Sequence, residues 1–288
     1  MCEIIFLGSG GGRFNLIRQF RSSGGFLIKF DSALIHVDPG PGALKTINSL
    51  GLDTQKINGI IITHNHIDHY LEAPLIIEAM SGFAIKKGGL LIGSSSVIEG
   101  EISKDGICDR VISGYHLSKL DETFVFKPYL KKEFNLKKFN LSFFLEGVPV
   151  LHEDKTGFGF VFNFNNKKIA YTSDTEALFD IHPKIFHSVD LLIANCLKPA
   201  EDEIPGHLSA ASLAKLLKLA KPKACIITHL GLKILQQGPS LIASKIEKES
   251  GVKTFAAIDG YVYNLENHTF KKFIKQKKSK KEKQQKLL

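Results

Sequence analysis

The sequence of 288 residues contains no apolar run near the roughly 18–20 residues that a membrane-spanning helix needs. Residues 1–8 lack the basic stretch that opens a signal peptide, and they read instead as a first strand. The four cysteines are dispersed and form no CxxC pair. These absences predict a protein with reduced thiols and without a membrane partner, and therefore a cytoplasmic one.

The chain has little net charge outside one end, because basic and acidic residues nearly balance there. The formal net charge is +9, but residues 271–288 hold nine lysines and one glutamate, a net of +8 that leaves +1 for the other 270 residues. A lysine-rich terminal run is more often a solvated tail than a binding element, although it would add salt-dependent attraction to RNA. We therefore expect one domain over residues 1–267 and a disordered lysine-rich tail over residues 268–288.

The densest group of metal-binding residue types follows a strand-length apolar segment, in the stretch Gly59-Ile-Ile-Ile-Thr-His64-Asn-His66-Ile-Asp68-His69. Imidazole nitrogens and carboxylate oxygens are the usual ligands of catalytic zinc. On an extended segment His64 and His66 face one side, whereas Asp68 and His69 point elsewhere once the chain turns into a helix. The spacing predicts that this loop serves two metal ions, about 3.5–4 Å apart as in two-metal hydrolytic sites.

Other candidate ligands also follow apolar runs. Asp38, His152, Asp174 and His229 each lie at or just after the end of such a run, and strand ends can converge on one edge of a sheet. Two strand-rich halves, about 1–145 and 146–265, favour two sheets packed face to face and covered by helices. Helices are expected at 43–50, 71–80, 209–220 and 240–250, and a polar loop around Arg13, Arg18 and Arg21.

This pattern resembles the metallo-β-lactamase superfamily of hydrolases over residues 3–265, with HxHxDH as its core motif. The resemblance implies an α/β fold of the four-layer αβ/βα sandwich type, with two mixed β-sheets flanked by helices and the site between them. It also implies two divalent metal ions, zinc first, with manganese or iron as alternatives. The implied ligands are His64, His66 and His152 for the first ion, Asp68, His69 and His229 for the second, and Asp174 as the bridge.

The resemblance also implies roles around the metals. Asp38 would support the ligand histidines by hydrogen bonding. A metal-bridging hydroxide would attack the substrate, and Asp68 would orient that hydroxide or accept its proton. The segment beginning Gly206-His207-Leu-Ser is similar to the phosphodiesterase branch, which includes tRNase Z and the cyclic-phosphate phosphodiesterases. His207 would there face the scissile phosphate and stabilise charge or protonate the leaving oxygen.

The predicted function is a phosphodiesterase acting on a small cyclic or nucleotide-type substrate or on RNA. Arg13, Asn195, Lys198 and Asp259 are the candidate substrate contacts. The chain lacks the His-Glu-Ala-Thr motif of tRNase Z, and Asn195 to Pro199 look closer to the cyclic phosphodiesterases. A tRNase Z-like RNA 3′-processing endonuclease, a thioester or lactone hydrolase, and an RNA-binding metalloprotein without turnover stay open, as do a homodimer and the role of His116.

Overall fold

The computed structural model describes residues 2–102, 108–136, 141–199 and 204–274, and its strands form two large sheets. The first sheet has the spatial order β18 (Thr269–Lys272), β17 (Tyr261–Asn264), β1 (Cys2–Phe6), β2 (Phe26–Phe30), β3 (Ala33–Val37), β4 (Gly59–Ile62), β5 (Leu90–Gly93) and β8 (Glu122–Val125). The second has the order β16 (Thr254–Ala256), β15 (Cys225–Thr228), β13 (Leu191–Lys198), β12 (Lys167–Tyr171), β11 (Gly159–Phe164), β10 (Leu141–Val148) and β9 (Lys131–Leu136). The short strand β14 (Leu208–Ser209) pairs with β13, and β6 (Glu101–Ile102) pairs with β7 (Cys108–Asp109).

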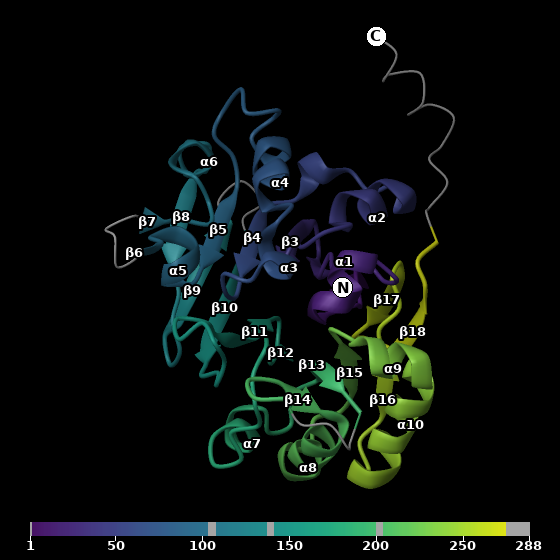
Figure 1. Ribbon diagram of the computed structural model, residues 1–288. Coiled ribbons are helices and arrows are strands. Elements are labelled where there is room, and N and C mark those ends of the chain that lie inside the picture. Colours follow the sequence, from purple (N-terminus) through teal and green to yellow (C-terminus); the bar gives the residue numbers. More distant parts are fainter. Residues whose placement is uncertain (1, 103–107, 137–140, 200–203, 275–288) are drawn as a thin grey trace.

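Both sheets are mixed, and each is covered by helices on its outer side. The helices are α1 (Gly12–Arg18), α2 (Ala43–Leu50), α3 (Ile67–Tyr70), α4 (Ala73–Met80), α5 (Ser95–Ile98), α6 (Gly114–Ser118), α7 (His182–Ile185), α8 (Ala210–Ala220), α9 (Leu232–Gln237) and α10 (Pro239–Ser250), with a 3-10 turn at Thr54–Lys56. In Figure 1, α2 and α4 lie in the upper part of the view and α8 and α10 in the lower part. The predicted four-layer αβ/βα sandwich is confirmed.

Three apolar clusters fill the spaces between these layers. Successive residues of β4 belong to different clusters. Ile61 packs between the two sheets, while Ile60 and Ile62 pack under α2 and α4. A third cluster joins the second sheet to α8 and α10. A strand buried on both faces reads as a continuous apolar run, which is why the sequence before His64 looks as it does.

Helix α8 illustrates a helix that the sequence specifies from both ends. Ser209 is its N-cap and forms a capping box with Ser212, in which each side chain accepts the other's backbone N–H. Leu213, Leu216 and Leu217 form the buried face. Lys221 ends the helix in a left-handed conformation.

Helix α1 replaces the polar loop expected around Arg13 and Arg18. Its apolar residues Phe14 and Ile17 are exposed, so no buried periodic face marked the helix in the sequence. The side chain of Asn15 holds the segment instead, because its amide donates to the carbonyl of Arg21 and its oxygen accepts the Arg21 N–H.

The boundaries drawn from the sequence also shift. Strand β10 contains residue 145, and β9 and β10 belong to the second sheet, so the expected halves do not coincide with the sheets. Strand β18 lies beyond residue 267 and pairs with β17, so ordered structure runs past the expected domain end. Residues 275–288 of the expected tail lie outside the described residues. Among the described helices, none is long and apolar enough to cross a membrane.

Candidate metal centre

Seven histidine and aspartate side chains gather between the two sheets, most of them just beyond strand ends. His64 and His66 follow β4, and Asp68 and His69 lie on α3. His152, Asp174 and His229 follow β10, β12 and β15. Their ligand atoms form two groups, each within 4.8 Å of one another: His64, His66, His152 and Asp174, and then Asp68, His69 and His229. We call these seven residues the ligand cluster.

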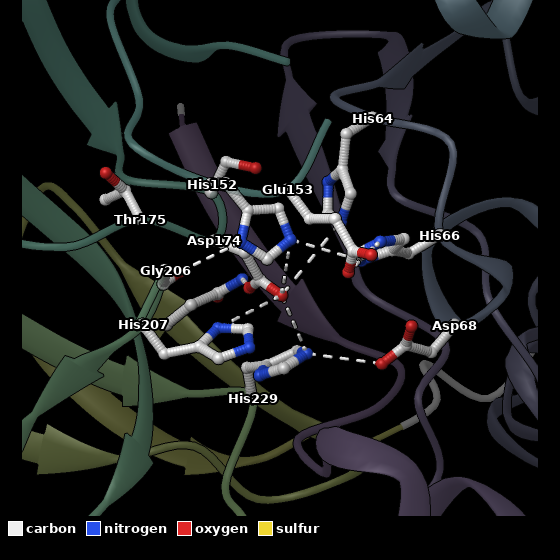
Figure 2. A network of polar contacts seen from close by, with 12 residues as sticks. His64, His66, Asp68, His152, Glu153, Asp174, Thr175, Gly206, His207 and His229 are labelled. Carbon is white, nitrogen blue, oxygen red and sulfur yellow. Dashed lines mark hydrogen bonds and ion pairs between the residues drawn. The ribbon is translucent and has the colours of Figure 1, made fainter. Parts of the chain in front are cut away.

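The Asp174 carboxylate lies between the two groups (Figure 2). Its Oδ2 atom is 3.4 Å from His229 Nε2 and 3.6 Å from His69 Nε2, on the side of the second group. The same atom is 4.0 Å from Nε2 of His64 and from Nε2 of His152, on the side of the first. One carboxylate oxygen is therefore within reach of imidazoles from both groups.

In His69 and His152, a hydrogen bond on Nδ1 leaves Nε2 turned toward the other members of the cluster. His152 Nδ1 donates to the Gly206 carbonyl and His69 Nδ1 donates to Asp38 Oδ2, each over 2.9 Å. Among the described residues, His64 Nε2 and His69 Nε2 are buried without a hydrogen-bond partner. Buried nitrogen lone pairs beside carboxylates are the donor set of a divalent metal site, so the residues present fit such ions.

Electrostatics reinforce that fit. Burial alone would lower the pKa of His69, but the carboxylates of Asp174, Asp38 and Asp68 raise it well above its usual value. Burial would raise the pKa of Asp174, but His229 and His69 hold it well below the usual range. The buried carboxylates thus remain ionised and attract positive charge to this point. A metal ion bound at His69 would take the place of the proton that the raised pKa favours.

Asp38 directly follows β3 and holds the cluster through hydrogen bonds. Its Oδ1 accepts the Thr63 N–H at 2.8 Å, and its Oδ2 accepts from the Thr63 hydroxyl at 2.9 Å and from His69 Nδ1 at 2.9 Å. Tyr171 donates its hydroxyl to the same Oδ2 at 3.0 Å. Asp38 therefore fixes the ring orientation of His69, one histidine of the ligand cluster.

Asn195 serves this interior rather than the substrate. Its Nδ2 donates to Asp174 Oδ1 at 2.6 Å and to Tyr171 Oη at 3.0 Å, and the residue is 3 % exposed. The chain Asp174–Asn195–Tyr171–Asp38 thus links two carboxylates of the site. Sequence reasoning missed Tyr171 and Thr63, because each reads as an ordinary residue at the end of a buried strand.

Of the other residues predicted to contact substrate, some line a cleft and one does not. Arg13, Lys198 and His207 line a cleft of about 640 Å³ that opens over the ligand cluster. Asp259 is not among the cleft residues, since its carboxylate accepts from the Ser9 hydroxyl at 2.6 Å and from the Ser22 N–H at 2.8 Å. Those two bonds tie loops together, so the substrate contact expected of Asp259 is not supported.

His207 points toward the cluster from its own loop (Figure 2). Its Nδ1 is 3.7 Å from Asp174 Oδ2, and burial lowers the pKa of His207 to about 4. The ring is therefore neutral at pH 7. His116 lies elsewhere, on α6, where its ring meets Ser113 and Glu78.

Residues 34–230 match the family model of the beta-lactamase superfamily domain, a span that includes every residue of the ligand cluster. The chain belongs to this superfamily. It is a hydrolase of the metallo-β-lactamase fold that depends on divalent metal, as the sequence predicted.

Relatives of this superfamily protein include an uncharacterised protein of Methanocaldococcus jannaschii, 35 % identical over 93 % of this chain and 97 % of the other. Ribonuclease Z of Pyrococcus abyssi is 32 % identical over 58 % of this chain and 50 % of its own length. The metallo-β-lactamase fold protein YhfI of Bacillus subtilis superimposes with a TM-score of 0.70 at 17 % identity, covering 91 % of this chain and 98 % of YhfI.

Proposed function

We propose that the protein is a dinuclear phosphodiesterase, with zinc as the first choice of metal and a nucleotide-type or RNA phosphodiester as substrate. His64, His66 and His152 would hold one ion, and Asp68, His69 and His229 the other, with Asp174 shared. When bound, such ions activate water and polarise the phosphoryl group. The observation that carries the proposal is the Asp174 Oδ2 atom, which lies within 4.0 Å of imidazole nitrogens from both groups.

Asp68 is the residue we assign to the attacking water. Burial would raise the pKa of Asp68, but His69 and a hydrogen bond from His229 hold it below its usual range, so it stays a carboxylate. Asp68 Oδ2 accepts from His229 Nε2 at 3.2 Å, and Asp68 lines the cleft. An ionised carboxylate in this position orients a water molecule by accepting its proton in a hydrogen bond.

We assign His207 the role of a hydrogen-bond donor to the phosphoryl group. A neutral imidazole carries one N–H, and on the cleft wall it would donate that hydrogen bond to an oxygen of the phosphoryl group. Because its pKa is lowered to about 4, we favour this donor role over proton transfer from an imidazolium.

The cleft favours an anionic substrate. Arg13 and Lys198 line it beside the ligand cluster, and cations of this kind pair with phosphate oxygens. The similarity to ribonuclease Z of Pyrococcus abyssi supports RNA 3′-end cleavage as a second candidate function, although it spans only half of that protein.

Side-by-side assays separate these functions from a thioester hydrolase. We expect the zinc- or manganese-loaded protein to cleave bis-p-nitrophenyl phosphate, and Asp68→Ala to lose this activity. His207→Ala should lose about 100-fold in turnover while keeping its metal content. His116→Ala is the matched control. Cleavage of a thioester but not the diester, or full activity in Asp68→Ala, would overturn the proposal.

A further inference from the structure

Phe14 is an exposed aromatic side chain on the wall of the cleft. It is 74 % exposed, and among the described residues that line the cleft it is the one aromatic side chain other than the histidines. A single exposed phenylalanine is ordinary on a protein surface. Phe14, however, lines the same cleft as members of the ligand cluster, where a flat apolar ring could stack on part of a bound substrate.

The backbone ties Phe14 to the cluster at a fixed position. Gly11 lies directly on the imidazole of His229, since a Cβ at Gly11 would fall 2.2 Å from His229 Cγ. The Gly11 N–H also donates to the Leu230 carbonyl at 3.2 Å. Phe14 follows three residues later, about one helical turn along α1. The backbone at the start of α1 is therefore held beside His229, a member of the ligand cluster.

The rest of the cleft combines apolar surface with positive charge. Ile67 and Leu232 come from α3 and α9, and Leu197 from β13. Arg13 and Lys198 supply cations along the same cleft. A volume of about 640 Å³ is within the range of pockets that enclose a nucleotide-sized ligand.

We propose that Phe14 stacks on the base of a nucleoside whose phosphodiester lies at the ligand cluster, with Arg13 pairing with a phosphate oxygen. Every nucleobase presents a π-face, so stacking on one ring selects for nucleotides without selecting the base. This inference rests on the proposed function and names its substrate class. Single nucleotides and the terminal nucleotide of an RNA share this chemistry.

Two diesters with the same leaving group test the stacking. Thymidine 5′-p-nitrophenyl phosphate and methyl p-nitrophenyl phosphate both release p-nitrophenol, so their ratio of kcat/KM reports the nucleoside alone. We expect the ratio to be well above one and to fall about tenfold in Phe14→Ala, and to be largely kept in Phe14→Tyr. Phe20→Ala is the matched control, because Phe20 is 61 % exposed but is not among the cleft residues.

A binding measurement keeps the test independent of turnover. Calorimetry of the metal-loaded protein should show adenosine monophosphate binding about tenfold more weakly to Phe14→Ala, with inorganic phosphate binding unchanged. A short oligoribonucleotide in the same titration separates an RNA end from a free nucleotide.

The outcomes distinguish the two proposals. If both diesters are cleaved and Phe14→Ala leaves their ratio unchanged, the stacking site is wrong while the phosphodiesterase stands. If neither diester is cleaved but adenosine monophosphate binding depends on Phe14, the proposed function is wrong while the nucleotide site stands. A change of oligomeric state in Phe14→Ala, with an unchanged ratio, would assign Phe14 to a contact between copies.

Discussion

Asn195 shows how much of the site depends on one buried amide. Its side-chain N–H groups donate to Asp174 and Tyr171, so Asn195→Ala removes the donor to Asp174 Oδ1 and leaves only the histidines at Oδ2 to orient this carboxylate. We expect metal affinity and kcat to fall by roughly 10–100-fold, as for other residues that orient ligands. Competition with a chromogenic chelator measures the affinity.

Tyr171→Phe is the companion variant for Asn195→Ala. It keeps the buried ring and removes the hydroxyl that joins Asn195 to Asp38. If the two residues act in one chain, the double variant should lose little more than the worse single variant. Additive losses, or unchanged metal affinity in Asn195→Ala, would show that the amide does not position Asp174.

His36 is a second residue whose buried environment has a measurable effect. It is fully buried on β3, its Nε2 donates to the Gly24 carbonyl at 2.8 Å, and burial lowers its pKa to about 4. Between pH 6.5 and 4 the unfolded chain binds a proton that the native chain does not. The free energy of unfolding should therefore decrease as the pH is lowered from 6.5 to 4, by about 3 kcal/mol from His36 alone.

Urea unfolding of the metal-free protein at pH 7 and pH 5 tests this expectation. The variant His36→Gln keeps a donor for the Gly24 carbonyl but cannot titrate, so its stability should fall less between the two pH values. A loss equal to that of the wild-type protein would mean that His36 does not carry the effect.

The residues of the site differ in how far the sequence predicts them. The candidate ligands of the HxHxDH loop are recognisable because two-residue spacing on an extended segment brings two histidines to one side. Asn195 and Asp259 were both expected to contact substrate, yet Asn195 is buried against Asp174 and Tyr171, and Asp259 bonds to Ser9 and Ser22. Of these partners, Asp174 and Ser9 are 21 and 250 residues away, and such contacts leave no local pattern.

Among the elements, β18 is the one whose contribution to stability is most directly tested by truncation. Phe270 lies 6.0 Å from Phe6, 5.6 Å from Phe255 and 5.4 Å from Tyr261, measured between ring centroids. A chain ending at residue 267 loses this strand and uncovers those rings. We expect it to be less stable by about 2 kcal/mol. A chain ending at residue 274 keeps β18 and is the control.

Thermal unfolding of the two shortened proteins gives the answer. The protein ending at residue 274 should melt with the full chain, and the one ending at residue 267 several degrees lower. Equal melting temperatures would mean that β18 contributes nothing to the sheet.

Helices and strands were predictable where they bury a periodic face. Helix α8 has its serine cap and its leucines at helical spacing, so its limits could be read from the sequence. Helix α1 has only seven residues and turns Phe14 and Ile17 outward, and β18 contains two of the lysines that suggested a tail. In α1, Phe14 lines the cleft and is not part of a buried face. In β18, Phe270 packs on Phe6 and Phe255, which are distant in sequence.

For the whole molecule, most of the net positive charge lies in the C-terminal lysine-rich run. Residues 275–288 carry seven lysines and one glutamate. Removing them should weaken binding to single-stranded RNA and flatten its dependence on salt, because each neutralised phosphate contributes about −0.7 to the slope of log K against log salt. Binding titrations at several salt concentrations measure the slope.

The hydrolytic assay accompanies that titration. Truncation at residue 274 leaves the ligand cluster and the cleft in place, so cleavage of bis-p-nitrophenyl phosphate should not change. An unchanged salt slope would show that RNA, if it binds, does so without the lysine-rich run.

The arrangement of the two sheets could be predicted from the order of strands and helices, but the membership of each sheet could not. Strands β17 and β18 cross from the second half of the chain to the first sheet, and β9 and β10 join the second sheet. Alternating apolar residues show that a strand is buried on one face, and they do not identify the strand beside it.

The pairing of β1 with β17 has a consequence for the order of events during synthesis. Glu3 and Ile5 pair with Asn264 and Val262, so one edge of β1 stays open until almost the whole described chain has left the ribosome. Every residue of the ligand cluster has emerged by then, since the last of them is His229. The nascent protein would therefore hold the whole ligand cluster beside an unfinished sheet, and a metal ion bound there would restrain that open intermediate against aggregation.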